Sequence, residues 1–156
     1  MPDIDKPDID KTDKAILNRI QSDFPISRRP YQVIASELQL DEERLIKRVQ
    51  RLKEKGIIRR IGGNFVPGKL GFVSTLCAGR VPDEKIDAFA AIVNTYRGVT
   101  HNYVRDNTYN IWFTMIAPSM ADIDRTLAEI TELTGVPNII SLPATRVFKI
   151  KAQFNL

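Results

Sequence analysis

Apolar residues in the first third of the chain recur with the spacing of amphipathic helices. This periodicity predicts helices around residues 12–22, 31–38 and 41–56. Thr12 is the expected N-cap of the first helix, and Gly56 is expected to end the third. These three helices are short enough to pack around one small core.

A change of pattern follows the third helix. Two short strands are predicted at residues 57–61 and 65–66, on either side of a Gly-Gly pair. Three helices followed by a β-ribbon are typical of a winged helix-turn-helix domain, which we place at residues 11–66. The preceding residues 1–10 repeat Pro-Asp-Ile-Asp, have little apolar content and are expected to form a mobile tail.

The second part of the chain, residues 67–156, alternates strands with helices. The predicted elements are a strand at 72–78, a helix from Pro82, a hairpin between 99 and 117, a helix from Ser119 to Gly135 and a last strand between Ile139 and Phe154. Phe148, Ile150, Ala152 and Phe154 are expected to share one face of that last strand. The order βαββαβ predicts a ferredoxin-like domain in an α+β chain, with both helices on one sheet face and the other face open.

Candidate chemistry gathers in the hairpin, within the sequence HNYVRDNTYNIWFT at residues 101–114. It contains the only His and the only Trp of the chain. Because side chains alternate along a strand, His101, Tyr103 and Arg105 are expected to share one face. A strand that only fills a core would carry Val, Ile or Leu at these positions.

For the remaining polar and aromatic residues of the hairpin, pattern alone leaves two roles open. On the returning strand, Trp112 is expected on the opposite face from Tyr109. Both aromatic residues are equally consistent with a binding wall and with core or dimer contacts. Asn102 and Asn110 can bind a ligand or simply satisfy backbone groups at the hairpin end.

Composition narrows the class of protein. The chain has 156 residues, 43% of them hydrophobic, and one cysteine, Cys77, which lies in an apolar run. A lone cysteine supports neither an internal disulfide nor a zinc cluster, so we expect no metal site and a buried structural thiol. No run reaches the roughly 18 apolar residues of a membrane span, and the acidic N-terminal residues do not resemble a signal peptide. A cytoplasmic protein with no membrane partner is expected.

Charge is unevenly distributed. Residues 1–70 contain 15 Lys and Arg against 11 Asp and Glu, whereas residues 71–156 contain eight of each. An anionic partner is therefore expected at the first part of the chain. The predicted outer face of the third helix is basic, and its members are Arg44, Lys47, Arg48, Arg51 and Lys55. Such a row suits phosphate contacts but offers little to read base edges, so we do not expect specific DNA binding.

The domain order resembles the Lrp/AsnC transcription regulators, whose first domain reads DNA and whose second domain dimerises and binds amino acids. Three finer motifs resemble the siroheme decarboxylases instead. These motifs are DFPISRRPY at 23–31, GIIRRIGGNF at 56–65 and the hairpin sequence at 101–114. The resemblance implies a lyase of the Ahb type in heme biosynthesis, which acts as a heterodimer of paralogous subunits. Its reaction removes CO2 from the C12 and C18 acetate side chains of siroheme to give 12,18-didecarboxysiroheme.

If the resemblance holds, the chemistry of the side chains suggests roles for residues of this chain. His101 and Tyr103 are the expected catalytic residues, since an imidazole delivers protons near neutral pH. The expected substrate-binding residues are Arg59, Arg60, Arg105, Asn102, Tyr109 and Trp112. No cofactor is expected, because the iron belongs to the tetrapyrrole substrate. Two alternatives stay open: an Lrp/AsnC-type regulator, and a heme or siroheme carrier with His101 as axial ligand.

Overall fold

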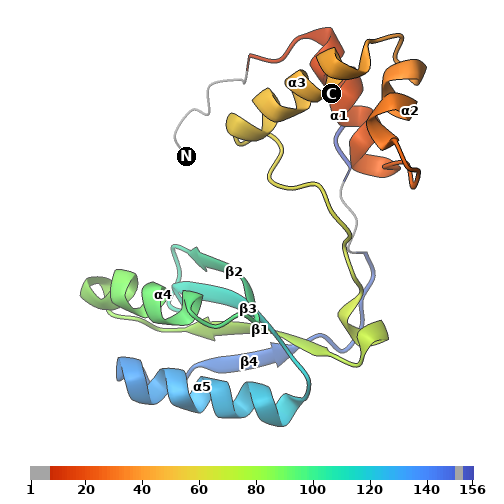
Figure 1. Cartoon of the computed structure of the whole chain (residues 1–156). Helices are drawn as coiled ribbons and strands as arrows, with labels where there is room; N and C mark the ends of the chain where they lie inside the picture. Colours follow the sequence, from red (N-terminus) through yellow and green to blue (C-terminus); the bar gives the residue numbers. More distant parts are fainter. Residues whose placement is uncertain (1–7, 150–152) are drawn as a thin grey trace. The chain divides into compact units, whose positions relative to one another are not determined.

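The computed structural model describes residues 8–149 and 153–156 (Figure 1). The chain divides into two compact units, which are treated separately below. The first unit comprises residues 1–63 with 149–156, and the second comprises residues 64–148.

Three helices form the first unit, as the periodicity predicted. They are α1 (Lys11–Ser22), α2 (Pro30–Glu37) and α3 (Glu42–Glu54). Asp10, rather than the predicted Thr12, caps α1, because its carboxylate accepts a hydrogen bond from the Asp13 backbone N–H. Asp41 caps α3, and Gly56 follows that helix at a left-handed φ of 71°, as expected.

The predicted ribbon after α3 is wrong. Residues 57–66 contain no strand. The backbone N–H groups of Ile57 and Ile58 both donate to the carbonyl of Leu52, at 3.0 and 3.1 Å. The segment is thus tied back to the end of α3, and the buried Ile58 side chain packs into the helical core. The first unit is a helix-turn-helix domain without the expected pair of strands in its described residues.

The second unit has the predicted βαββαβ order and confirms the ferredoxin-like expectation. Its elements are β1 (Val73–Gly79), α4 (Ile86–Asn94), β2 (Val99–Val104), β3 (Ile111–Ala117), α5 (Met120–Thr134) and β4 (Ile140–Pro143). Short 3₁₀ turns at Pro67–Leu70 and Asp83–Lys85 precede β1 and α4. The strands pair antiparallel in the order β2-β3-β1-β4. Ser119 caps α5 and Gly135, with φ at 63°, ends it, as expected.

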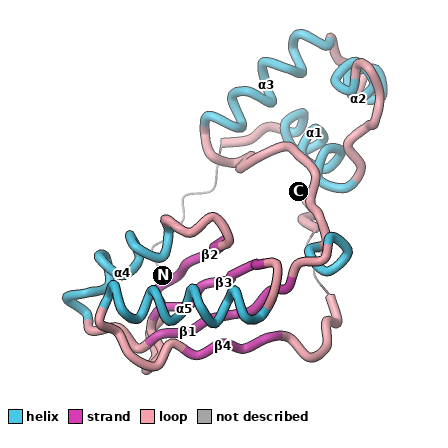
Figure 2. The backbone as a smooth tube through the Cα atoms, turned by 60° about the horizontal axis from the view of Figure 1, so that its bottom comes forward, coloured by secondary structure: helices cyan, strands magenta, loops and turns pink. Residues whose placement is uncertain are grey.

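One face of this sheet carries the core. Phe89 and Val93 from α4 and Ile123, Leu127 and Ile130 from α5 pack with inward residues of the strands, among them Cys77, Ile111, Phe113 and Met115. Figure 2 shows the two helices over the sheet, with the strands running beneath α5. Neither α4 nor α5, the two α-helices in the described part of the second unit, covers the opposite sheet face, as the topology predicted.

The predicted last strand is only partly right. β4 ends at Pro143, and residues 144–149 have no regular structure. Proline lacks the N–H that would extend the ladder with β1. Phe148 therefore lies outside the strand and is exposed, while Ile150 and Ala152 lie outside the described residues. Phe154 belongs to the first unit, where its backbone bonds to α1.

Candidate functional site

The hairpin of β2 and β3 places three polar side chains in one exposed row. The rings of His101 and Tyr103 stack with centroids 6.0 Å apart and an interplanar angle of 28°. The Arg105 Cζ lies 5.9 Å from the centroid of the Tyr103 ring. All three side chains are exposed, so the predicted shared face is confirmed. We call these residues the hairpin row.

This geometry leaves the reactive groups of the hairpin row accessible. His101 Nδ1 lies 3.0 Å from Thr100 Oγ1, whereas Nε2 has no hydrogen-bond partner within the described part of the chain. An imidazole with one ring nitrogen held and the other exposed can pass a proton to a bound molecule. The Arg105 guanidinium can hold a carboxylate through two parallel hydrogen bonds.

Trp112 extends the row with an aromatic surface. It lies directly opposite Tyr103 in the β2–β3 register and is half-buried. Its indole Nε1–H donates to the carbonyl of Tyr109 at 2.6 Å, which fixes the ring orientation. Tyr109 itself lies just before β3 and is half-buried. The structure thus brings Trp112 to the hairpin row. The backbone carbonyl of Tyr109 holds the Trp112 ring in place.

The open face changes from polar to apolar across the sheet. In register with His101 lie Thr114 of β3, Leu76 of β1 and Leu142 of β4. Leu76 and Leu142 are 41% and 45% exposed, which is high for leucine on a sheet. A molecule lying on this face meets an imidazole at one edge and an apolar platform beside it.

Asn102 does not join the hairpin row. It points to the helix side of the sheet, where its Nδ2 donates to Asn94 Oδ1 of α4 at 3.1 Å. Its buried Oδ1 has no hydrogen-bond partner among the described residues. A substrate contact by Asn102 beside His101 is therefore not supported by this arrangement.

Asn110 holds the hairpin end in place. Its Oδ1 accepts from the Val81 N–H at 2.9 Å, and its Nδ2 donates to the Val81 carbonyl at 2.7 Å. This two-bond contact joins the start of β3 to the segment between β1 and α4. Sequence reasoning allowed such a backbone role for Asn110 but gave no means of finding its partner, 29 residues away.

Arg59 and Arg60 lie in the first unit, at a semi-open cavity of about 730 Å³. Among the lining residues that the structure describes, they are the only two with charged side chains. The apolar lining comes from Ile9, Leu17, Ile20, Phe24, Ile26, Ile57, Ile58, Ile61, Phe154 and Leu156. Both arginines are exposed. The cavity therefore combines an apolar wall with two cations, which suits an amphipathic anion.

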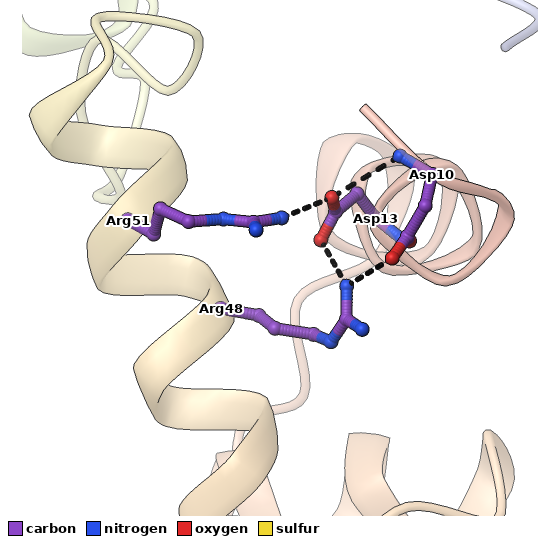
Figure 3. Close-up of polar contacts among 4 residues, drawn as sticks. All are labelled: Asp10, Asp13, Arg48 and Arg51. Carbon is purple, nitrogen blue, oxygen red and sulfur yellow. Dashed lines mark hydrogen bonds and ion pairs between the residues drawn. The ribbon is translucent and has the colours of Figure 1, made fainter. Parts of the chain in front are cut away.

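The basic row of α3 is not a free cationic surface, contrary to expectation. Figure 3 shows Arg48 and Arg51 directed at two carboxylates of the α1 N-terminus. Arg48 Nη1 lies 2.7 Å from Asp10 Oδ2 and 2.8 Å from Asp13 Oδ1, and Arg51 also pairs with the fully buried Asp13. A buried carboxylate without such partners is strongly unfavourable, so these arginines contribute to folding.

The ion pairs also shift protonation equilibria. The backbone N–H of Asp13 and then the Arg48 side chain hold the pKa of Asp10 below its ordinary value. Hydrogen bonds to Asp10 and Asp13 raise the pKa of Arg48. A further α3 cation, Lys47, pairs with Glu43 at 2.6 Å. Only Arg44 and Lys55 of the predicted row have no ion pair within the described residues.

Other candidate chemistry is limited. Cys77 is fully buried in the core, and burial raises the pKa of its thiol to about 12, as expected for a structural residue. Within residues 8–149 and 153–156, no group of His, Cys, Asp and Glu is arranged to hold a metal ion. None of the helices in this part is both long and apolar enough to cross a bilayer.

Comparisons with known proteins match a separate family model to each of the two units. Residues 13–59 match the model of the siroheme decarboxylase NirDL-like HTH domain, and residues 69–149 match that of the AsnC-like ligand binding domain. The chain is 52% identical over 149 residues to the siroheme decarboxylase alpha subunit of Desulfovibrio desulfuricans, covering 96% of this chain and 86% of the relative. It is 48% identical to the alpha subunit of Oleidesulfovibrio alaskensis, covering 99% and 94%.

Solved structures show the same relationship. The siroheme decarboxylase NirDL superposes with a TM-score of 0.67 at 32% identity, over 93% of this chain and 47% of that chain. This chain therefore spans about half the length of NirDL. The leucine response regulatory protein LrpA of Mycobacterium tuberculosis has a TM-score of 0.80 at 17% identity over 95% of this chain and 100% of that chain, which shows a shared fold alone. On the domain matches and the identity to the alpha subunits, the chain belongs to the siroheme decarboxylase family.

Proposed function

We propose that this chain is a subunit of a siroheme decarboxylase. The reaction removes CO2 from the C12 and C18 acetate side chains of siroheme and yields 12,18-didecarboxysiroheme for heme biosynthesis. The observation that carries the proposal is the exposed hairpin row, with an imidazole, a phenol and a guanidinium beside Trp112 and an apolar platform. A NirDL structure in complex with an iron-uroporphyrin III analogue supports a carboxylated iron tetrapyrrole as ligand class.

The chemistry needs a proton at the carbon that loses CO2. Breaking the bond between the acetate methylene and its carboxylate leaves an electron pair on the methylene carbon. The conjugated macrocycle, protonated on a ring carbon, accepts that pair and forms an exocyclic methylene. Protonation of the methylene carbon and loss of the ring-carbon proton then give a methyl group, so that one proton is consumed overall. No further cofactor is required, and the iron is part of the substrate. The protein supplies positioning, desolvation of the carboxylate and the proton.

Each residue of the row has a distinct part in this proposal. His101 delivers the proton through its exposed Nε2. Tyr103, stacked against it, donates a hydrogen bond to the reacting carboxylate. Arg105 holds a carboxylate that stays, because a tight ion pair to the departing group stabilises the ground state and slows its loss. Trp112 supplies a flat apolar wall for the macrocycle.

A paralogous subunit is part of the proposal. The relatives at about half identity are named alpha subunits, and others are named NirD and NirG subunits. The NirDL relative of Paracoccus denitrificans is long enough that this chain covers 45% of it. We propose a heterodimer in which a second, similar chain accompanies this one.

Specific DNA binding is disfavoured as the alternative function. The Lrp/AsnC-type regulator requires α3 to present its cations to phosphates. Arg48 and Arg51 instead pair with Asp13, and Lys47 pairs with Glu43. The fold likeness to LrpA carries no functional weight at 17% identity.

One preparation can separate these functions. The chain, co-expressed with a paralogous subunit, is incubated anaerobically with siroheme for a CO2-release assay, and the same sample is used in a gel-shift assay. We expect CO2 release together with weak, salt-sensitive DNA binding. Binding to a specific DNA at nanomolar affinity without CO2 release would instead establish the regulator.

A further inference from the structure

Residues 153–156 lie along α1 and are held through their backbone. Gln21 Nε2 donates to the Phe154 carbonyl at 2.7 Å, and the Phe154 N–H donates to Gln21 Oε1 at 2.9 Å. Asn18 makes the same two contacts with the carbonyl and N–H of Leu156, each at 3.4 Å. Gln153 Nε2 donates to Ser22 Oγ at 2.7 Å. Two side-chain amides thus hold an extended segment as the edge of a neighbouring strand would.

This arrangement sets the direction of the apolar side chains. Phe154 and Leu156 are two positions apart, so in an extended segment they share one face. Both line the cavity that carries Arg59 and Arg60. Phe154 remains 68% exposed although it lines that cavity. The 153–156 segment is therefore one wall of the cavity, and most of the surface of its aromatic ring is exposed.

The side chains that line the cavity indicate which kind of ligand it suits. Among the described lining residues, Arg59 and Arg60 have the only charged side chains, and the Gln21 amide is occupied by the segment. A volume of about 730 Å³ is of the size that encloses small ligands. An apolar ring edge bearing carboxylates matches this combination, because its ring packs on Phe154 and its carboxylates pair with the two arginines.

We propose that this cavity is a binding site for a carboxylated tetrapyrrole, with Phe154 as its aromatic wall. Asn18 and Gln21 are positioning residues that act through the 153–156 segment. The inference rests on the proposed function for its ligand class, and it adds a contact surface in the first unit that lies apart in the sequence from the hairpin row. Arg59 and Arg60 bind carboxylates at this cavity.

Absorbance titration with iron uroporphyrin III tests the site on the full chain in complex with its paralogue. Phe154→Ala is expected to weaken binding roughly tenfold, since the ligand buries an aromatic surface of this size. Phe154→Trp is expected to restore it. Phe148→Ala is the matched control, because Phe148 is also exposed, at 84%, and does not line the cavity. The control is expected to bind like the unaltered chain.

A second pair of variants tests the positioning role. Gln21→Ala is expected to weaken binding of iron uroporphyrin III to a similar degree. The double variant Gln21→Ala with Phe154→Ala is expected to bind it with the same affinity as Phe154→Ala alone. Additive losses would indicate general disturbance and contradict action through the segment. Thermal unfolding of each variant separates lost binding from lost folding.

The inference and the proposed function fail in different ways. If the unaltered complex does not bind iron uroporphyrin III, or if Phe154→Ala binds it as tightly as Phe148→Ala does, the cavity site is overturned. CO2 release from siroheme by the same variants would leave the function standing. Conversely, binding that depends on Phe154 without any CO2 release from siroheme would overturn the function and retain the site.

Discussion

Helix α3 of the first unit and the β2–β3 hairpin of the second use charged residues in opposite ways. In the first unit, Arg48 and Arg51 form ion pairs with the buried carboxylate of Asp13, and these pairs join α1 to α3. In the second unit, His101 and Arg105 are exposed on a sheet face and have no carboxylate partner among the described residues. Charge thus contributes to folding at α3 and is available to a ligand at the hairpin.

This difference shows that the ion-pair partners of a row of charged residues must be known before the row is assigned a function. The cations of α3 and those of the hairpin are equally visible in sequence. The helix places Arg48 and Arg51 one turn apart, within reach of the α1 N-terminus, whereas the edge strand β2 turns alternate side chains away from the core. The following predictions test whether the charges of α3 serve folding and those of the hairpin serve chemistry.

The largest effect is expected at the hairpin row. His101→Ala is expected to lower the rate of CO2 release by about 10²–10⁴-fold, because it removes the positioned proton donor. Binding of iron uroporphyrin III, measured separately, is expected to change little. Thr108→Ala, at an exposed position in the turn of the same hairpin, is the control and is expected to keep full activity. Unchanged turnover in His101→Ala would remove its catalytic assignment.

A stability effect of intermediate size is expected in the first unit. Asp13→Ala leaves Arg48 and Arg51 without their buried partner and is expected to lower the free energy of unfolding by about 3 kcal/mol. Chemical denaturation of the purified chain measures this change. Glu43→Gln, which breaks only the exposed pair with Lys47, is the control and is expected to have a small effect. Equal losses in both variants would contradict a special role for the buried carboxylate.

The smallest effect is expected in how the free energy of unfolding depends on pH under acidic conditions. The folded-state pKa of Asp10 lies below its ordinary value of 3.8. Its contribution is therefore complete above that ordinary value and is lost as the pH falls through the lowered folded pKa. Asp10→Asn keeps a good helix cap but removes the charge, so unfolding of this variant is expected to depend less on pH between about pH 2 and 5. An identical pH dependence in both proteins would exclude Asp10 as a source of it.

Local pattern predicted most of the fold. The βαββαβ order, the Ser119 cap and the shared face of His101, Tyr103 and Arg105 follow from spacing over a few residues. The family motifs were equally local and identified the family correctly.

What pattern could not predict depends on contacts between distant residues. Asp13 lies 35 residues from Arg48, and the Asn18 partner Leu156 lies 138 residues away. The prediction of two strands after α3 was wrong, because the backbone N–H groups of Ile57 and Ile58 donate hydrogen bonds to the Leu52 carbonyl. The last strand was predicted too long, since hydrophobic alternation continues beyond Pro143 although the pairing with β1 stops there.

Mass spectrometry of the tetrapyrrole most directly tests the central claim, that the exposed imidazole row of the second unit supports decarboxylation of siroheme. Siroheme is incubated anaerobically with this chain and a co-expressed paralogous subunit, and the pigment is extracted. The account predicts a product that has lost two molecules of CO2, and predicts its absence when this chain carries His101→Ala. Siroheme recovered at unchanged mass from the unaltered, tetrapyrrole-bound complex would contradict it.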